Sequence, residues 1–562
     1  MRKKNYEWCD IVGGGVGVLW GRVLVVPGLI AKVMGVDPER KTPAFTKRDN
    51  VDYIPAHPTV LFGHHFAAIA GAGPIVGPVL AAQFGWVSVT LWIILGCIFI
   101  GAAHDMIALI LSVRHEGESI GSVIGKIMGP LGKVLFLLFS WSALILVVAV
   151  FASQIAGTFV ADPAIATSSL LFIAEAIVFG ICVNKLKMPV LWASLIFVPL
   201  MFAFVWIGKL IPLDLMAMFG LSKAATMMVW CVVLLVYCFF ASTCPVWILL
   251  QPRDYLNAYL LYAMMILGIL GVFVAHPALN INAFTGLKSF GSNLPLMPIL
   301  FVTVACGACS GFHSLVASGT SSKQLDNEKN ARPIAYGGML LEGVLAMIAL
   351  IGVAGTYASQ GEYTAALGGM TPVAMFASSV AGFCAKLGIP LEIAKGFMLL
   401  SVSAFLMTTV DAGTRLARFS WQELLGPRES QPHGAGTSGF LKLARNMYVG
   451  TLLVCVLAAG FLMGGEKTTT SLWTLFASAN QLLATLTLVT MTIWFLKNKK
   501  PYFMTAIPAA FMMVVSSWAL ILKFVEAINK ADILMAATSI FLLGLGAVVV
   551  VLAIKEIKCL RK

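Results

Sequence analysis

The sequence predicts an all-α polytopic membrane protein with about fifteen transmembrane helices and a core of five-plus-five inverted repeats that contains discontinuous helices. Three observations support this fold class. Of the 562 residues, 59% are hydrophobic, and the mean hydropathy is +0.92. Only 11% are charged, against about 25% in an ordinary soluble domain. Apolar runs of about 20 residues, the length that spans a bilayer, recur along the chain. A soluble globular protein is therefore excluded.

The apolar runs define the predicted spans in chain order. They are 11–33, 58–82, 88–113, 133–157, 166–183, 188–208, 226–250, 256–275, 297–318, 334–357, 393–413, 441–463, 471–496, 502–523 and 532–554. A further stretch at 371–387 is short and rich in glycine, and we interpret it as a re-entrant or surface helix in a long loop. The first run is too long for the apolar region of a signal peptide and lacks a small-residue cleavage site, so it is kept as a span.

The formal net charge of +13 is interpreted as a topology signal. Basic residues lie in short groups between apolar runs, which does not favour a nucleic-acid partner and indicates contact with membrane lipid. One set of alternate loops carries 25 of the 38 Lys and Arg residues, and the other carries 11. The positive-inside rule then predicts the N-terminus outside and the C-terminus in the cytoplasm. The cluster Arg2–Lys4 at the outer end opposes this orientation.

The span at 58–82 is predicted to be a broken helix. It is apolar enough to cross a membrane, yet glycines and prolines interrupt it, and proline removes a backbone donor and clashes with the preceding turn. Discontinuous helices of this kind are typical of transporter binding sites. The alternative is an unbroken helix whose glycines allow close packing. The predicted substrate-binding residues here are Gly71, Ala72, Gly73, Pro74 and Gly77.

A second polar interruption at Ser242 and Thr243, followed by Cys244 and Pro245, adds two predicted substrate-binding residues in the seventh span. Each interrupted span opens a block of five, and the two blocks have opposite predicted orientation, which gives the inverted repeat. The predicted division is an N-terminal span and cytoplasmic loop, two repeats, a basic cytoplasmic loop and four accessory spans. The boundaries are 1–57, 58–208, 209–413, 414–440 and 441–562.

Polar and ionisable residues inside apolar spans are the candidates for ion or proton coupling. The set comprises His64, His65, Asp105, Ser310, Ser314, Glu342, Thr408, Thr409 and Asp411, and His313 is added as a substrate contact. At helical spacing Ser310, His313 and Ser314 share one face. Each acid has a structural alternative, and Asp411 either pairs with Arg415 or gates the inner pathway. The hydroxyl groups have the alternative of bonding back to their own helices.

No cofactor is predicted, and no metal site. Cys306 and Cys309 form a CxxC inside an apolar run, without the setting of a redox motif. His64 and His65 are adjacent, so on a helix they point about 100° apart and cannot both face one metal. The alternative functions are a membrane redox protein that holds haem or a metal through histidines from several spans, and a transporter-like nutrient sensor.

Several long segments resemble signature segments of the carbon starvation protein A family, in the family's order from about residue 37 to 500. They are VLFGHHFAAIAGAGPIVGPVLAAQFGW, GAAHD, PRDYL, ACGACSGFHSLVASGTSSK, YGGMLLE, TTVDAGTRLARF and LWTLFASANQLLA. The resemblance implies a transporter, not an enzyme, in the inner membrane of a bacterium, with a five-plus-five core. It further implies uptake of short peptides or pyruvate during nutrient starvation, with a proton as the usual coupling ion; sodium is the alternative.

The predicted mechanism is alternating access around the break at Gly71 to Pro74. The free amide end of a half-helix carries partial positive charge, which suits a carboxylate. Pyruvate and the C-terminus of a peptide both have a carboxylate, so this feature does not separate the two substrates.

Overall fold

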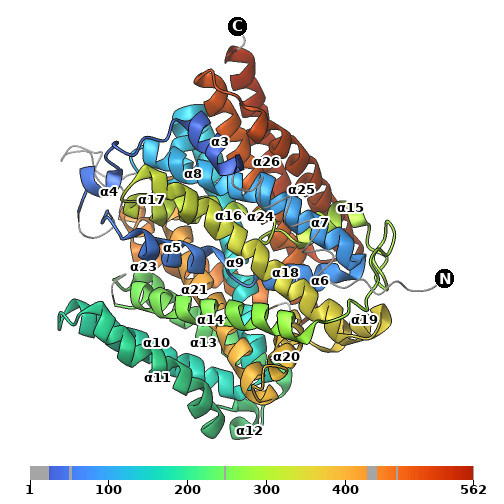
Figure 1. Ribbon diagram of the computed structural model, residues 1–562. Coiled ribbons are helices and arrows are strands. Elements are labelled where there is room, and N and C mark those ends of the chain that lie inside the picture. The colour runs from blue at the N-terminus through green and yellow to red at the C-terminus, as the bar shows by residue number, and fades with distance from the viewer. Residues whose placement is uncertain (1–24, 50–52, 246–247, 427–438, 464–465, 561–562) are drawn as a thin grey trace.

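The computed structural model describes residues 25–49, 53–245, 248–426, 439–463 and 466–560. Within these ranges the chain consists of helices joined by turns and loops (Figure 1). Two isolated β-bridges, Ala56–Leu325 and Lys288–Pro295, are the only extended pairings in the described residues. The prediction of an all-α chain is confirmed.

Eleven helices of the described chain are long and apolar enough to cross a membrane, or twelve when one bent pair is counted as a span. The elements are α7, η3 and α8 (Trp86–Gly96, Cys97–Gly101, Ala102–Arg114), α9 (Ile120–Ala161), α10 (Pro163–Asn184), α11 and α12 (Val190–Leu210, Leu215–Phe219), α13 (Lys223–Thr243), α14 (Leu250–Ala275), η5, η6 and α18 (Glu328–Asn330, Arg332–Gly337, Gly338–Thr356), α21 (Leu391–Leu424), α24 (Glu466–Lys497), α25 (Phe503–Asn529) and α26 (Ile533–Leu560). The bent pair is α5 (Pro58–Ile69) and α6 (Gly73–Ala81), which η2 (Ala82–Phe84) follows.

The other three predicted spans take shorter forms. The span at 11–33 is described only from residue 25, as α3 (Val25–Met34). The span at 441–463 contains α23 (Met447–Leu462), which α22 (Gly439–Ala444) precedes. The span at 297–318 is divided into α15 (Leu296–Thr303) and α16 (Gly311–Val316). The count of fifteen spans therefore stays a prediction.

Two broken segments lie side by side at the centre of the molecule. The axis bends by 44° between α5 and α6, where residues 70–72 leave the helix. α15 and α16 are separated by residues 304–310, and a π-helical turn η4 (Ala317–Ser321) and α17 (Ser322–Gln324) follow α16. α15 packs on α6 and α16 packs on α5. The two broken segments therefore run in opposite directions.

Each broken segment is followed by a 29-residue span that contains a π-helical turn. Trp86–Arg114 contains η3, and Glu328–Thr356 contains η6. η6 packs on α8, the last part of the first span, and α18 packs on α7, its first part. The two spans are therefore also antiparallel.

Long helices form the interior, and less buried helices lie at two sides of it (Figure 1). α9 and α21 pack along each other more extensively than any other pair in the described chain. The apolar window of α21 is 89% buried and that of α24 is 83% buried, whereas the window of α11–α12 is only 28% buried and that of α26 is 33% buried. In Figure 1 α10 to α12 lie at one side of the bundle and α25 and α26 at the opposite side. α9 and α21 therefore belong to the core.

The prediction that the span at 226–250 is interrupted is wrong, because α13 ends at the polar run. This helix stops at Thr243, Cys244 has extended backbone, and α14 begins at Leu250. The polar run is therefore the terminus of α13 and not an interruption within a span. The reason is that polar residues and a proline mark the end of a helix as well as a break within it.

The stretch at 371–387 forms α20 (Pro372–Ala385), a short apolar helix that follows α19 (Gln360–Gly369). α20 packs against α21, α14, α18 and α6. Its residues Met375 and Phe376 have no exposed surface. α20 is therefore an internal helix and does not lie on the surface.

Loops on the side where α8 ends are tied together by one buried carboxylate. Glu328 accepts hydrogen bonds from Arg114 Nε at 2.8 Å, Arg114 Nη2 at 2.9 Å and the backbone amide of Asp37 at 3.0 Å. Asp37 precedes the short helix α4 (Pro43–Thr46), where Thr42 donates to the carbonyl of Leu325 at 2.5 Å. These bonds fix the loop after α3 to the segment that opens the span of α18.

Candidate functional site

The two helix breaks meet around a very small cavity. A Cβ on Gly73 would clash with the side chain of Cys306, and a Cβ on Gly77 would lie 2.7 Å from the carbonyl oxygen of Thr303. Only glycine allows α6 to approach the second broken segment this closely. The cavity has a volume of about 10 Å³, close to the minimum that holds one water molecule. Its lining residues are Ile69, Gly71, Gly73, Val147, Phe151, Cys306, Phe312, Thr409 and Phe476.

This junction brings together several predicted site residues. Gly71 and Gly73 lie in the cavity wall with Thr409 of α21, whose Oγ1 would be 2.6 Å from a Cβ on Gly71. Ala72 caps α6, and Pro74 lies in its first turn. The Thr409 hydroxyl donates to the carbonyl of Phe405 at 3.1 Å. This is the bond back to the same helix that was the alternative for the hydroxyl groups.

Side chains from neighbouring helices satisfy the backbone groups that the second break frees. Trp92 Nε1 lies 3.1 Å from the carbonyl oxygen of Val304 and 3.2 Å from that of Phe301. Gln481 Nε2 also donates to Phe301 O, at 2.5 Å. Asn480 Oδ1 accepts from the amide of Phe312, in the first turn of α16, at 2.8 Å. The break is therefore a built feature, because backbone groups inside a membrane need such partners.

Asn480, Gln481 and Trp92 were missed as site residues. Asn480 also donates to Ser310 Oγ at 3.0 Å, so the predicted coupling residue Ser310 is bonded to α24. The predicted Ser314 donates to Gly311 O at 2.7 Å and lies 3.2 Å from Thr487 Oγ1. The signal was the polar pair Asn480–Gln481 inside an otherwise apolar span, which follows the same rule as the other candidates.

A histidine of the second broken segment lies between two buried carboxylates. His313 Nδ1 is 2.8 Å from Asp105 Oδ2, and His313 Nε2 is 3.2 Å from Glu342 Oε2. Asp105 Oδ1 is 2.8 Å from Nδ1 of His104. All four side chains have no exposed surface. The cluster joins α8, α16 and α18, and it confines acid and base groups to a site without solvent.

The other predicted histidines lie apart from this cluster. His65 Nδ1 lies 2.8 Å from Ser321 Oγ in η4, and its ring packs on Gly338. His64 Nδ1 lies 3.6 Å from Asp254 Oδ2 at the start of α14. The two rings therefore serve different contacts, in agreement with their predicted divergence on a helix.

Asp411 pairs with Arg253. The pair with Arg415, which was one of the two alternatives predicted for Asp411, does not form in the described part of the chain. Asp411 Oδ2 accepts from Nη1 of Arg253 and, at 2.8 Å, from the hydroxyl of Tyr237. Arg415 instead donates to the carbonyls of Ala241 and Cys244 at 2.9 and 2.8 Å. The four-residue spacing allowed the pair, but the free carbonyls at the end of α13 lie within reach of Arg415 and attract a cation.

Ser242, Thr243 and Thr408 do not line the small cavity at the junction of the breaks. The Ser242 carbonyl accepts from Arg418 Nη1 at 2.8 Å, and the Thr243 hydroxyl donates to Phe239 O at 2.9 Å. The Thr408 hydroxyl donates to Ala404 O at 3.1 Å and accepts from Nδ2 of Asn257. Ser242 and Thr243 therefore belong to the capped end of α13.

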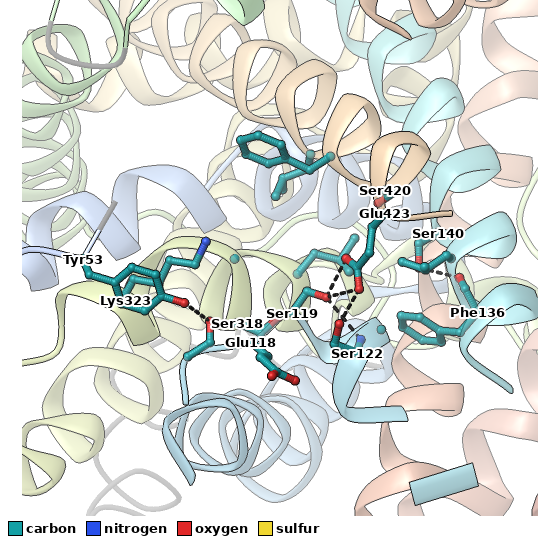
Figure 2. Close-up of a pocket in the computed structure, with 17 residues that line it drawn as sticks. Tyr53, Glu118, Ser119, Ser122, Phe136, Ser140, Ser318, Lys323, Ser420 and Glu423 are labelled. Carbon is teal, nitrogen blue, oxygen red and sulfur yellow. Dashed lines mark hydrogen bonds between the residues drawn. The ribbon is translucent and has the colours of Figure 1, made fainter. Parts of the chain in front are cut away.

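A larger cavity of about 220 Å³ lies between the start of α9 and the end of α21 (Figure 2). Leu315 and Ser318, next to His313 on the same segment, form part of its wall. Figure 2 shows Lys323 and Tyr53 on one side and Glu423 with Ser119 and Ser122 on the other. The remaining lining residues are Gly117, Glu118, Gly121, Phe136, Leu137, Ser140, Gly319, Leu416, Phe419 and Ser420.

Charged groups lie on two walls of this cavity. Glu423 accepts from Ser122 Oγ and, at 2.9 Å, from Ser119 Oγ, and Lys133 Nζ lies 3.2 Å away. Lys323 Nζ lies 5.4 Å from the centre of the Tyr53 ring. The volume of the cavity is far above the minimum of about 10–15 Å³ that holds one water molecule. In the described residues, no group of three or more His, Cys, Asp or Glu side chains is arranged to hold a metal ion.

The chain is similar to known proteins over most of its length. The family model described as carbon starvation protein CstA matches residues 27–367 and 354–519. The pyruvate/proton symporter BtsT of Escherichia coli is 33% identical in an alignment of 572 positions that covers 88% of this chain and 78% of that protein. The peptide transporter CstA of Bacillus subtilis is 31% identical, with 94% and 93% covered. The Escherichia coli peptide transporter CstA is 34% identical, with 86% and 76% covered.

Both comparisons agree over most of the chain. The predicted resemblance is confirmed, and the family to which it points consists of transporters and not of enzymes. The chain is a multi-pass membrane protein of the carbon starvation protein CstA family.

Proposed function

We propose that the protein is a secondary transporter that imports a small carboxylate-bearing nutrient, a short peptide or pyruvate, by alternating access and with a proton. One observation carries the proposal: the two broken helices meet at a small cavity, and the second holds His313 between Asp105 and Glu342. The relatives are named for peptide transport and for pyruvate/proton symport. A carboxylate is common to both substrates.

The substrate site in this proposal is the junction of the breaks. Breaks near the middle of the membrane expose backbone groups and helix ends to a substrate. Here the cavity is nearly closed, at about 10 Å³, which agrees with a conformation in which the broken helices have closed around the site. The larger cavity, which shares the segment of His313, is then the inner mouth of the pathway.

The coupling site in this proposal is the His313 cluster. A protonated imidazole donates from both nitrogens and can bridge the two carboxylates, whereas a neutral ring donates from only one. Loss of the proton leaves buried negative charge without its partner, which is costly in a membrane. Because His313 belongs to a broken segment, its protonation favours one arrangement of that segment over another.

The proposed core is still a five-plus-five inverted repeat, but its second unit opens at α15. The first unit is 58–210, and the second is 296–497 with the short α20 left out. The opposite directions of α5/α6 and α15/α16 support this division, as do those of the two 29-residue spans. The third members are α9 and α21, which are also antiparallel, since Val147 contacts Gly413 while Phe136 and Leu416 line one cavity.

The proposed location is the inner membrane of a bacterium, with fifteen spans, the N-terminus outside and the C-terminus in the cytoplasm. The basic loops support this orientation. The proposed role is uptake of the nutrient during starvation. The description of the family as carbon starvation proteins supports this role.

The test is uptake of labelled pyruvate and of labelled alanyl-alanine by proteoliposomes of the full chain, under an imposed proton gradient or an imposed sodium gradient. We expect concentrative uptake of one of them with the proton gradient, and loss of uptake with a proton ionophore. Uptake no greater than that of empty liposomes for both compounds would contradict the function. Uptake driven only by sodium would contradict the coupling ion.

A further inference from the structure

A fully buried arginine lies at the start of α14, outside both proposed repeats. Arg253 has no exposed surface, although arginine is among the residues that are almost never fully buried without partners. Its Nη1 donates to Asp411 Oδ2 on α21 and to the hydroxyl of Tyr237 on α13. One end of the guanidinium is therefore held by two other helices, α21 and α13.

The opposite edge of the same guanidinium has no hydrogen bond. Neither Nε nor Nη2 of Arg253 has an acceptor among the described residues. The nearest carboxylate oxygen, Asp254 Oδ1, is 3.8 Å from Nη2, and it too has no donor in the described chain. Two buried cationic donors without acceptors are costly, and each such group calls for a ligand or water.

The free edge has the geometry that binds a carboxylate. Nε and Nη2 point in parallel from one side of the planar guanidinium, and this pair matches the two oxygens of a carboxylate. We propose that Arg253 is the anchor for the carboxylate of the transported substrate. This inference rests on the proposed function, because it names the residue that would select carboxylates.

The surroundings of Arg253 connect it to the junction of the breaks. Asn257, one turn along α14, donates to Ala404 O at 3.1 Å and to the hydroxyl of Thr408 on α21. The next residue on α21, Thr409, lines the small cavity. On the other side His64 of α5, the first half of the first broken segment, lies 3.6 Å from Asp254. The anchor therefore contacts helices that border the proposed path.

The Arg253 edge is sealed in this structure, because the side chains of Arg253 and Asp254 are 0% and 3% exposed. A substrate reaches it only when the start of α14 separates from α5 or α21. If α14 moves away from α5 and stays packed on α21, the bond between Arg253 and Asp411 is kept. The anchor then faces the gap between α14 and the first broken segment.

The charges around Arg253 predict which neighbour opposes substrate binding. Asp411 already pairs with the guanidinium, and Asp254 faces the edge that a substrate would take. The other titratable groups nearby are Tyr237 and Cys238 on α13 and His64 on α5. Since like charges repel, removal of the Asp254 charge is expected to strengthen binding of a carboxylate.

The experiment measures equilibrium binding to the purified full chain and compares each acid with its amide. The probes are pyruvate against pyruvamide and alanyl-alanine against alanyl-alanine amide. We expect the acid of the transported pair to bind more tightly than its amide by about tenfold or more. Arg253→Lys should reduce this preference, because lysine keeps the charge and loses the two-point contact.

A paired variant separates recognition from folding. Arg253→Gln alone would leave Asp411 buried without its cation, so Arg253→Gln is combined with Asp411→Asn, which removes both charges together. A monodisperse double variant should bind acid and amide equally. Asp254→Asn should tighten binding of the acid by about tenfold and leave binding of the amide unchanged.

The outcomes distinguish the two proposals. A folded double variant that keeps the preference of the parent for the acid overturns the anchor and leaves the transport function standing. Weaker binding of the acid by Asp254→Asn also contradicts the anchor. If the parent chain binds and transports neither pyruvate nor alanyl-alanine, the proposed function fails, and the anchor fails with it.

Discussion

His313 Nδ1 lies 2.8 Å from Asp105 Oδ2, although 208 residues separate the two in the chain. The histidine belongs to the second broken segment, and the aspartate belongs to the span that follows the first. Glu342 completes the contact from the other side of the ring, at 3.2 Å. A proton bound here therefore acts on both halves of the proposed core.

Replacement of Glu342 by glutamine is predicted to uncouple transport from the proton gradient. Glutamine keeps the size of the side chain and removes the carboxylate whose oxygen lies 3.2 Å from His313 Nε2. We expect Glu342→Gln to lose gradient-driven uptake while it keeps exchange of labelled for unlabelled substrate across proteoliposomes. Glu175→Gln is the matched control, because Glu175 is a buried acid on α10 outside the cluster. Equal loss in both variants would indicate a structural role.

A methyl group at Gly73 is predicted to stop transport by forcing the two broken segments apart. The added Cβ clashes with the side chain of Cys306, which removal of that side chain in Cys306→Gly relieves. We expect Gly73→Ala to lose most of its uptake and Gly73→Ala with Cys306→Gly to recover part of it. Gly382→Ala on α20 is the control, since no heavy atom lies within 4 Å of its added Cβ. Uptake by Gly73→Ala at the parental rate would refute the close approach.

The sequence predicted the first break because glycine and proline leave a local signal at residues 71–78. The second break was missed for the opposite reason. Residues 304–310 are small and mostly apolar, so nothing local forbids a helix there. The break is instead stabilised by distant side chains, Trp92 and Gln481, which take the freed carbonyls. Contacts of that kind depend on tertiary packing, which one sequence does not reveal.

The predicted site shows the same division between local and distant information. The buried acids Asp105, Glu342 and Asp411 were recognisable because charges inside apolar spans are rare. Their partners were not recognisable from spacing. Arg415 lies one turn from Asp411, yet Arg253 makes the pair, because Arg415 caps the end of α13. The spacing of residues along a helix shows which side chains of that helix lie close together. It gives no information about the side chains of the helix packed against it.

The larger cavity is predicted to open to the cytoplasm, and thiol labelling tests this orientation. Ser420 lines the cavity at the end of α21, near the basic residues on which the positive-inside assignment rests. In a Cys559→Ser background, which removes an exposed native thiol, we expect Ser420→Cys to react with a membrane-impermeant thiol reagent in inverted vesicles and not in intact cells. Bound substrate should slow the reaction. Reaction from the outer side alone would reverse the topology.

Glu328 is predicted to be a principal stabilising group of the loops on the side where α8 ends. Its side chain has no exposed surface and accepts two bonds from Arg114, while Arg40 lies 3.6 Å away. Loss of the buried carboxylate removes the acceptor of Arg114 Nε and of the Asp37 amide and leaves Arg114 Nη2 only with the carbonyl of Gly35, so Glu328→Ala should cost about 3 kcal/mol of stability. The measurement is the thermal unfolding midpoint of the purified chain in detergent. Glu526→Ala is the control, because Glu526 is more exposed and its pairs with Lys523 and Lys530 are local contacts at the end of α25. Surface pairs contribute less than about 1 kcal/mol. A midpoint for Glu328→Ala equal to that of the control would show that the buried carboxylate does not hold these loops together.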